Sequence, residues 1–161
     1  MIGIKLAASR RTTDPLHHPI AELAAARGVP ILQHIWQHRR KEWPGQEASD
    51  AAELCAWAAR HPTVSFILAH LGGGGDWLHS LHALRLTPNV LIDLSGSGVD
   101  EGLLERCLEA VGVERLLWGC DITMETGWAK LRRLEGLLSS PELEAIRWAN
   151  AARIFPKRAF A

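Results

Sequence analysis

The sequence lacks several features that mark particular classes of protein. Lysine plus arginine and aspartate plus glutamate number 18 each, so there is no basic excess of the kind that favours nucleic acid binding. No apolar run approaches the roughly 20 residues that a membrane-spanning helix needs, and the N-terminus does not have the layout of a signal peptide. These absences predict a cytoplasmic protein that binds neither nucleic acid nor membrane.

Cysteine is scarce, and two nucleotide-binding motifs are missing. Cys55, Cys107 and Cys120 are widely spaced and form no CxxC, which is typical of a protein from a reducing compartment. Cys55 and Cys107 fall on apolar helix faces, so we expect them to be small buried hydrophobic residues. The sequence has no GKS/T and no GxGxxG with a following acidic partner, which disfavours nucleotide binding.

What the sequence does contain is a strand–helix unit repeated five times. The five apolar runs are near-continuous, as expected for parallel strands that are covered on both faces. Each is followed by a loop and an apolar 3.6-residue pattern, with helix starts predicted at Pro19, at Ser49 or Asp50, at Asp100, and at a capping box formed by Ser139 and Glu142. The runs span residues 1–6, 29–34, 64–70, 90–95 and 115–121.

Two architectures fit this order of elements. One is an open, doubly wound sheet, and the other is a consecutive arc of a (β/α)8 barrel. A barrel of eight units needs about 250 residues, so five units in 161 residues match five-eighths of one. Periodicity leaves both architectures open, and in either case residues 1–161 form one domain without a linker.

Four polar residues occupy equivalent places in these units. Lys5, His34, His70 and Asp121 each lie at or just past the carboxyl end of a predicted strand. In parallel α/β folds the loops at that end converge, and active sites form there. Imidazole and carboxylate groups bind zinc, iron or manganese and also act as general bases. The four residues together therefore predict a metal or acid–base site.

Each feature also has a plainer interpretation. A single histidine after a strand is more often structural, and Asp121 can cap a turn. The glycines at 72–75 precede a helix, and a glycine-rich loop before a helix binds anions. A doubly wound phosphate-binding protein therefore remains an alternative, although its motif is absent. We expect His17, His18 and His38 to lie in loops near the same edge without a catalytic role.

Six segments in the same order resemble the amidohydrolase-related metal-dependent hydrolases of the amidohydrolase superfamily. The segments are Gly3-Ile-Lys-Leu6, Pro30-Ile-Leu-Gln-His34, Ile67-Leu-Ala-His70-Leu-Gly-Gly73, Asn89-Val-Leu-Ile-Asp-Leu-Ser95, Leu116-Leu-Trp-Gly-Cys-Asp121 and Asn150-Ala-Ala-Arg-Ile-Phe155. The resemblance implies a distorted (β/α)8 TIM barrel of which the chain supplies strands four to eight and a C-terminal helix. The superfamily also contains decarboxylases that act on aromatic or unsaturated acids.

The resemblance also implies roles for the four residues. His34 matches the metal-binding histidine that ends the family's fifth strand, and His70 matches the sixth-strand histidine that orients the substrate or the metal-bound water. Asp121 matches the eighth-strand aspartate that takes the proton from that water and often touches the metal. Lys5 lies on the fourth strand and is a weak candidate ligand. The implied cofactor is a divalent metal, zinc in the first place, with manganese or iron as alternatives.

The ligands of the family's first strand have no counterpart in this sequence. The family's His-x-His triplet does not occur, because His17 and His18 are adjacent and His34 and His38 are four residues apart. An arc of five strands also exposes two edges and its interior face. We therefore expect a truncated barrel, with Met1 at a buried strand, that either oligomerises or misses an N-terminal part.

Four functions remain open at this point. The first is hydrolysis of a C–N or C–O bond of a small-molecule substrate by metal-activated water, and the second is a metal-dependent decarboxylation on the same scaffold. The third is a non-catalytic barrel fragment, and the fourth is phosphate binding by the glycines at 72–75. The loop 35–48, with Trp36, Arg39, Arg40 and Trp43, is a candidate cover for the site. The sequence does not identify the substrate.

Overall fold

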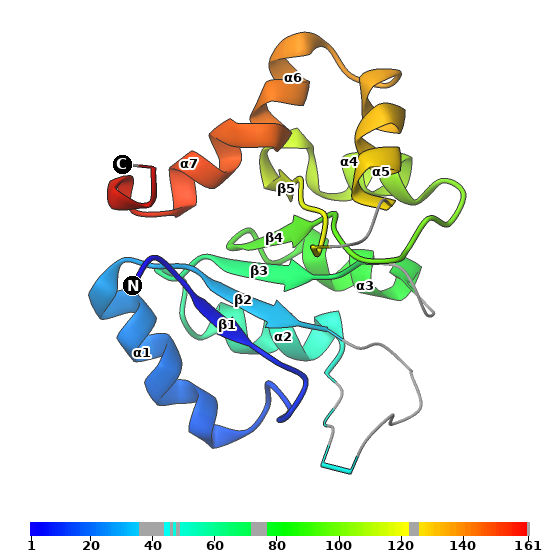
Figure 1. Cartoon of the computed structure of the whole chain (residues 1–161). Helices are drawn as coiled ribbons and strands as arrows, with labels where there is room; N and C mark the ends of the chain where they lie inside the picture. Colours follow the sequence, from blue (N-terminus) through cyan, green and yellow to red (C-terminus); the bar gives the residue numbers. More distant parts are fainter. Residues whose placement is uncertain (36–43, 46, 48, 72–76, 123–125, 161) are drawn as a thin grey trace.

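The computed structural model describes residues 1–35, 44–45, 47, 49–71, 77–122 and 126–160. The five strands form one parallel sheet in the order β1-β2-β3-β4-β5, and each strand pairs with the next along the chain (Figure 1). This arc of consecutive βα units confirms the predicted fold class. The strands are β1 Ile4–Leu6, β2 Ile31–His34, β3 Phe66–Ala69, β4 Val90–Asp93 and β5 Leu116–Leu117.

Helices connect successive strands and are capped largely as the sequence predicts. They are η1 Pro15–His17, α1 His18–Arg27, α2 Ala51–Ala59, α3 Trp77–Arg85, α4 Leu103–Val111, η2 Val113–Arg115, α5 Thr126–Glu135, α6 Ser140–Glu144, the π-helix η3 Ala145–Ala149, α7 Asn150–Ile154 and η4 Lys157–Ala159. In the described part of the chain, no helix combines the length and apolar character required to cross a membrane.

The predicted caps can be compared one by one. Asp50 caps α2 by accepting a bond from the backbone of Glu53, and Ser139 forms the expected capping box. The prediction for α4 was wrong. Its N-cap is Gly102, in the left-handed region at φ 76°, and the side chain of Asp100 does not cap the helix.

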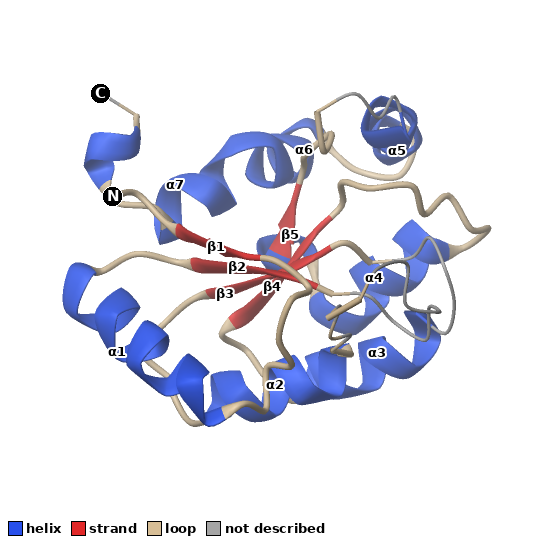
Figure 2. Cartoon of the chain, turned by 60° about the horizontal axis from the view of Figure 1, so that its bottom comes forward, coloured by secondary structure: helices blue, strands red, loops and turns tan. Residues whose placement is uncertain are grey.

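The sheet has two differently covered faces, as Figure 2 shows. Side chains from the outer face join a large core with α1 to α4, because alternate residues of a strand point to opposite faces. The inner face carries a smaller cluster of Ile67, Leu91 and Leu117. Ala151, Ile154 and Phe155 from the C-terminal segment pack against this cluster. The chain therefore covers part of its own inner face.

This arrangement corrects two expectations from the sequence. The inner-face residues Ile67, Leu91 and Leu117 do not face water, because the C-terminal segment covers them. The first strand is not buried, since Ile4 and Leu6 are only partly covered, Lys5 is exposed and Met1 is 62% exposed.

The C-terminal segment also covers the outer edge of β5. The amide of Trp118 donates to the carbonyl of Ile146 at 3.1 Å instead of continuing the strand, which explains why β5 is shorter than the predicted run 115–121. The two ends of the chain lie on the same side of the molecule in Figure 1, and Arg158 donates to the carbonyl of Met1 at 2.8 Å. The segment after β5 thus spans the space between the two edge strands.

Side chains fasten the amino-terminal ends of β4 and β5. Asn89 Nδ2 donates to the carbonyls of Ala58, His61 and Val64 at 3.0–3.2 Å. The guanidinium of Arg115 donates to the carbonyls of Leu84, Thr87 and Val90. Asn150 donates to those of Val113 and Leu116. These bonds add side-chain donors to carbonyls of helices, strands and loops, several of which also accept a main-chain N–H. We call this group, Asn89, Arg115 and Asn150, the base of the sheet.

Candidate active site

A pocket of about 340 Å³ runs along the inner face of the sheet to the carboxyl ends of the strands. Three of the four residues singled out by the sequence, Lys5, His70 and Asp121, line it. The ring of His34 lies beside it, 5.0 Å from the ring of His70. The complete lining is Lys5, Leu32, Ile67, His70, Asp93, Ser95, Leu117, Trp118, Gly119, Asp121, Ala151 and Phe155.

His70 is held on one side by a short chain of hydrogen bonds. The hydroxyl of Ser95 donates to Asp93 Oδ2, and the amide of Ser95 donates to Asp93 Oδ1 at 3.0 Å. Because its hydrogen is used in this way, the Ser95 oxygen accepts from His70 Nδ1, 2.6 Å away. His70 therefore carries its hydrogen on Nδ1, and Nε2 is the nitrogen left to exchange a proton in the pocket.

Asp121 faces this free nitrogen. Its Oδ2 lies 3.6 Å from His70 Nε2, and its side chain is 40% exposed. Asp121 has φ 54° and Ile122 has φ 57°, so both occupy the left-handed region, which aspartate tolerates and a β-branched residue disfavours. The backbone strain therefore falls on Ile122, next to the residue that presents the carboxylate, and functional sites often retain strain of this kind.

Lys5 brings a positive charge to the same pocket. Burial lowers the pKa of its ammonium, and the carboxylates of Asp121 and Asp93 oppose this effect. The first strand and the ends of the fourth and fifth units therefore contribute to one electrostatic environment. An ammonium in the lining of the pocket can stabilise negative charge on an oxygen of a substrate.

Two glycines allow the groups of the site to approach closely. A side-chain carbon on Gly96, at φ 78°, would lie 2.6 Å from His70 Cβ. One on Gly119 would lie 2.8 Å from Asp93 Oδ1. Any larger residue at these positions would push the histidine or the carboxylate out of place.

The residues of this site do not by themselves fit a metal centre. Within the described ranges, no three His, Cys, Asp or Glu side chains come close enough together to hold an ion. Protein zinc sites use three or four such ligands. His34 and Asp121 lie on either side of His70 but do not complete a set, so their assignment as ligands stays a prediction.

Sequence reasoning missed Asp93 and Ser95. Both were interpreted only as part of the fourth apolar run, although they are the polar residues in it and their spacing of two places them on one face of a strand. Three predictions fall outside the described residues: phosphate binding by Gly72 to Gly75, the loop position of His38, and a cover formed by Trp36, Arg39, Arg40 and Trp43.

The fold is similar to that of several solved enzymes. An amidohydrolase from Burkholderia multivorans with bound zinc is 18% identical, with a TM-score of 0.72, over 97% of this chain and 65% of that one. The 5-carboxyvanillate decarboxylase from Sphingomonas paucimobilis is 18% identical, with a TM-score of 0.66, over 96% and 58%. A dihydroxybenzoic acid decarboxylase from Polaromonas sp. JS666, with bound manganese and an inhibitor, is 14% identical, with a TM-score of 0.59, over 88% and 54%.

The chain thus spans less than two thirds of the length of these structures. At such low identity the likeness concerns the fold, a partial TIM barrel. No curated protein matches the sequence. A family model described as "Amidohydrolase" matches residues 2–157. The near-complete match and the arc of parallel βα units lead to one conclusion: the chain belongs to the amidohydrolase family.

Proposed function

We propose that the pocket is the acid–base part of a metal-dependent hydrolase that cleaves a C–N or C–O bond of a small molecule. The observation that carries this proposal is the placement of His70 between two groups. Ser95 and Asp93 fix its Nδ1 side, and Asp121 faces its Nε2 side. A histidine oriented by hydrogen bonds on one nitrogen, with a carboxylate at the other, is suited to general acid–base catalysis.

Each side chain has a role in this proposal. The carboxylate of Asp121 or Nε2 of His70 takes a proton from the attacking water, and the same proton is later given to the leaving nitrogen or oxygen. The ammonium of Lys5 stabilises negative charge that develops on the substrate oxygen. The atoms balance, because water supplies both the hydroxyl that is added and the proton that leaves with the product.

A divalent metal is part of the proposal because two of the similar structures contain zinc or manganese. The described residues offer too few ligands to hold one. The steps above are therefore assigned only to side chains of this chain. His34 and Asp121 are the residues we propose as its contributions to a metal centre.

A decarboxylase of an aromatic acid is the second candidate, and the pocket wall favours it. Trp118, Phe155 and Leu32 form an apolar surface that would accept a ring. Lys5 is placed to pair with a carboxylate, and His70 can deliver the proton that replaces the lost carbon dioxide. Two of the similar structures are decarboxylases.

The experiment is an assay of the full chain with and without added zinc or manganese. Hydrolysis is followed with p-nitrophenyl acetate and a p-nitroanilide, and carbon dioxide release with 5-carboxyvanillate and 2,6-dihydroxybenzoate. For whichever reaction is found, we expect Asp121→Asn to lower the rate at least ~100-fold, because a general acid or base typically accelerates a reaction by at least that factor.

The matched control is Asp100→Asn, an exposed aspartate outside this pocket, which should keep the rate of the unchanged chain. Equal rates for the Asp121 variant and the unchanged chain would contradict the proposal. No turnover by the unchanged chain in any of these assays would support the third function, a non-catalytic barrel fragment.

A further inference from the structure

Lys130 is a buried lysine that the proposed chemistry does not use. It lies on α5 with only 4% of its surface exposed. Its Nζ donates to the carbonyls of Leu94, Ser95 and Gly96 at 2.8, 3.1 and 3.0 Å. Lysine is rarely buried so completely, because removing its charge from water is costly. The Lys130 ammonium can be buried because each of its three N–H donors has a carbonyl acceptor.

These carbonyls belong to the loop that supports His70. Ser95, the middle residue, bonds both Asp93 and His70 through its hydroxyl. Gly96, the last residue, lies against the His70 side chain so closely that a Cβ there would clash. The loop has a second tie, since Thr126 Oγ1 donates to the Gly96 carbonyl at 2.7 Å. A continuous set of contacts therefore runs from α5 to the imidazole.

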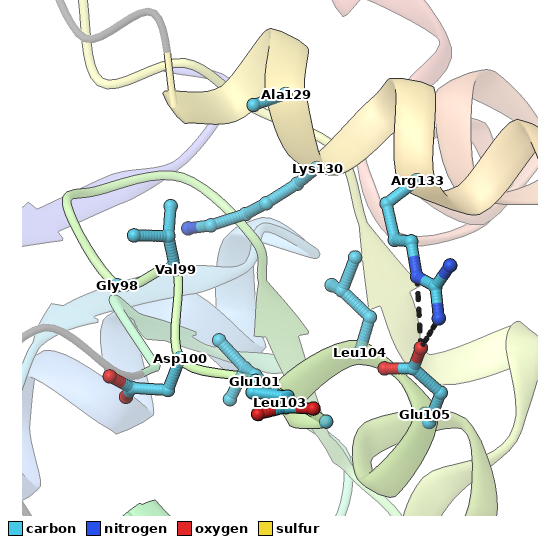
Figure 3. A pocket seen from close by; sticks show the side chains of 11 residues that line it. Gly98, Val99, Asp100, Glu101, Leu103, Leu104, Glu105, Ala129, Lys130 and Arg133 are labelled. Carbon is cyan, nitrogen blue, oxygen red and sulfur yellow. Dashed lines mark hydrogen bonds and ion pairs between the residues drawn. The ribbon is translucent and has the colours of Figure 1, made fainter.

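Lys130 reaches this loop through the wall of a second cavity. The cavity of about 560 Å³ is lined by residues from α4, α5 and the loop before α4. Figure 3 shows the Lys130 side chain extending from α5 toward the loop at Gly98 and Val99. Arg133, one turn further along α5, turns to Glu105 instead and pairs with it at 2.9 Å.

Two carboxylates lie close enough to support the charge of this buried lysine. Burial lowers the pKa of the Lys130 ammonium, and the negative charges of Asp93 and Asp100 partly oppose this effect. Asp93 is the same carboxylate that accepts the Ser95 hydroxyl. The ammonium thus lies near the hydrogen bonds that join Asp93, Ser95 and His70, although Lys130 does not line the pocket that contains His70.

We infer that Lys130 is a positioning residue, which holds the Leu94–Gly96 loop so that Ser95 keeps His70 in the tautomer with its hydrogen on Nδ1. The inference deepens the proposed function and rests on it for the catalytic meaning of His70. An apolar side chain of similar length would leave three carbonyls without their donor. The loop would then move to find other partners, and the Ser95–His70 bond would be lost.

The test measures the nitrogen-15 chemical shifts of the His70 ring, which report the nitrogen that carries the hydrogen. The signals are assigned by their loss in His70→Asn. In Lys130→Met we expect the Nδ1 and Nε2 signals to move toward those of a ring exchanging between its two tautomers. In the control Arg133→Met, on the same helix, they should stay where they are in the unchanged chain.

A folded Lys130→Met chain with unchanged His70 signals would overturn the inference. If that variant fails to fold, Lys130→Gln decides, because its shorter amide has two N–H donors in place of the three of the ammonium. A shift of the His70 signals in Lys130→Gln supports the inference, and no shift refutes it.

The ring signals do not depend on turnover. An inactive chain whose His70 signals respond to Lys130→Met would refute the proposed function and leave the link to Lys130 standing. Where activity is found, kcat should fall in Lys130→Met while KM changes little, since the loop orients His70 and does not line the substrate wall formed by Trp118 and Phe155.

Discussion

The base of the sheet and the pocket at its other end use polar side chains in opposite ways. At the base, Asn89, Arg115 and Asn150 bond main-chain carbonyls of neighbouring segments. At the carboxyl ends, His70 and Asp121 face other side chains and an open pocket. The first arrangement satisfies the backbone, and the second leaves a nitrogen and a carboxylate available to a ligand.

This difference separates stability from chemistry within one small fold. In βα folds the carboxyl ends of strands carry catalytic groups and the opposite ends mainly support the structure. The base should therefore respond to substitution with a loss of stability, and the pocket with a loss of activity. Variants at each end can break or sharpen this contrast.

The largest effect is expected at Arg115. Arg115→Met removes donors from the carbonyls of Leu84, Thr87 and Val90. We expect the free energy of unfolding, measured by urea denaturation, to fall by about 3 kcal/mol, since each of the lost hydrogen bonds contributes about 1 kcal/mol.

The control for this variant is Arg106→Met. Arg106 forms an exposed pair with Glu109 on α4, and its loss should cost less than about 1 kcal/mol. Equal losses in the two variants would show that the base does not have the structural weight assigned to it.

Next comes the opposite pattern, at His70. His70→Asn should lower any catalytic rate at least ~100-fold, as expected for loss of an acid–base group. Its free energy of unfolding should change by only about 1 kcal/mol, the value of one hydrogen bond. His82→Asn, an exposed histidine on α3, is the matched control and should change neither quantity. A large loss of stability in His70→Asn would erase the contrast between the two ends.

The smallest expected effect is a change in stability with pH that arises at His61, next to the base of the sheet. His61, whose carbonyl accepts from Asn89, has a pKa lowered from 6.5 mainly by burial and further by His18 and Arg60, while Glu22 raises it. The unfolded chain then binds this proton at a higher pH than the folded chain. Stability is therefore full above about pH 6.5 and declines as the pH falls below it.

Urea denaturation between about pH 7 and pH 5 measures this decline. We expect His61 to contribute about 0.5 kcal/mol to it, because the group is partly exposed. His61→Gln should make the decline shallower by that amount. An unchanged slope in this variant would show that His61 is not responsible.

The sequence predicted the repeated units well because apolar periodicity reflects burial directly. It placed His70 and Asp121 correctly beyond the carboxyl ends of their strands, whereas Lys5 lies in the middle of β1. All three residues line one pocket. The sequence overestimated the length of β5, because the partner of the Trp118 amide lies 28 residues away at Ile146. Local patterns do not contain such distant pairings.

The residues that position His70 could not be predicted from the sequence either, because they contact one another across long separations in the chain. Ser95 lies 25 residues from His70, and Lys130 lies 34–36 residues from the carbonyls it binds. A lysine in a helical segment is normally an exposed residue, so nothing marked Lys130 as buried. The covering of the inner face likewise depended on where Phe155 packs after the last helix.

The most direct test of the central claim is the tautomer of His70 in the unchanged chain. Nitrogen-15 spectra at about pH 8, where an ordinary imidazole is neutral, distinguish a hydrogen on Nδ1 from one on Nε2. The account predicts a hydrogen on Nδ1, lost to a mixture of tautomers in Ser95→Ala. A hydrogen fixed on Nε2 in the unchanged chain would contradict it, because the nitrogen facing Asp121 would then have no lone pair with which to accept a proton.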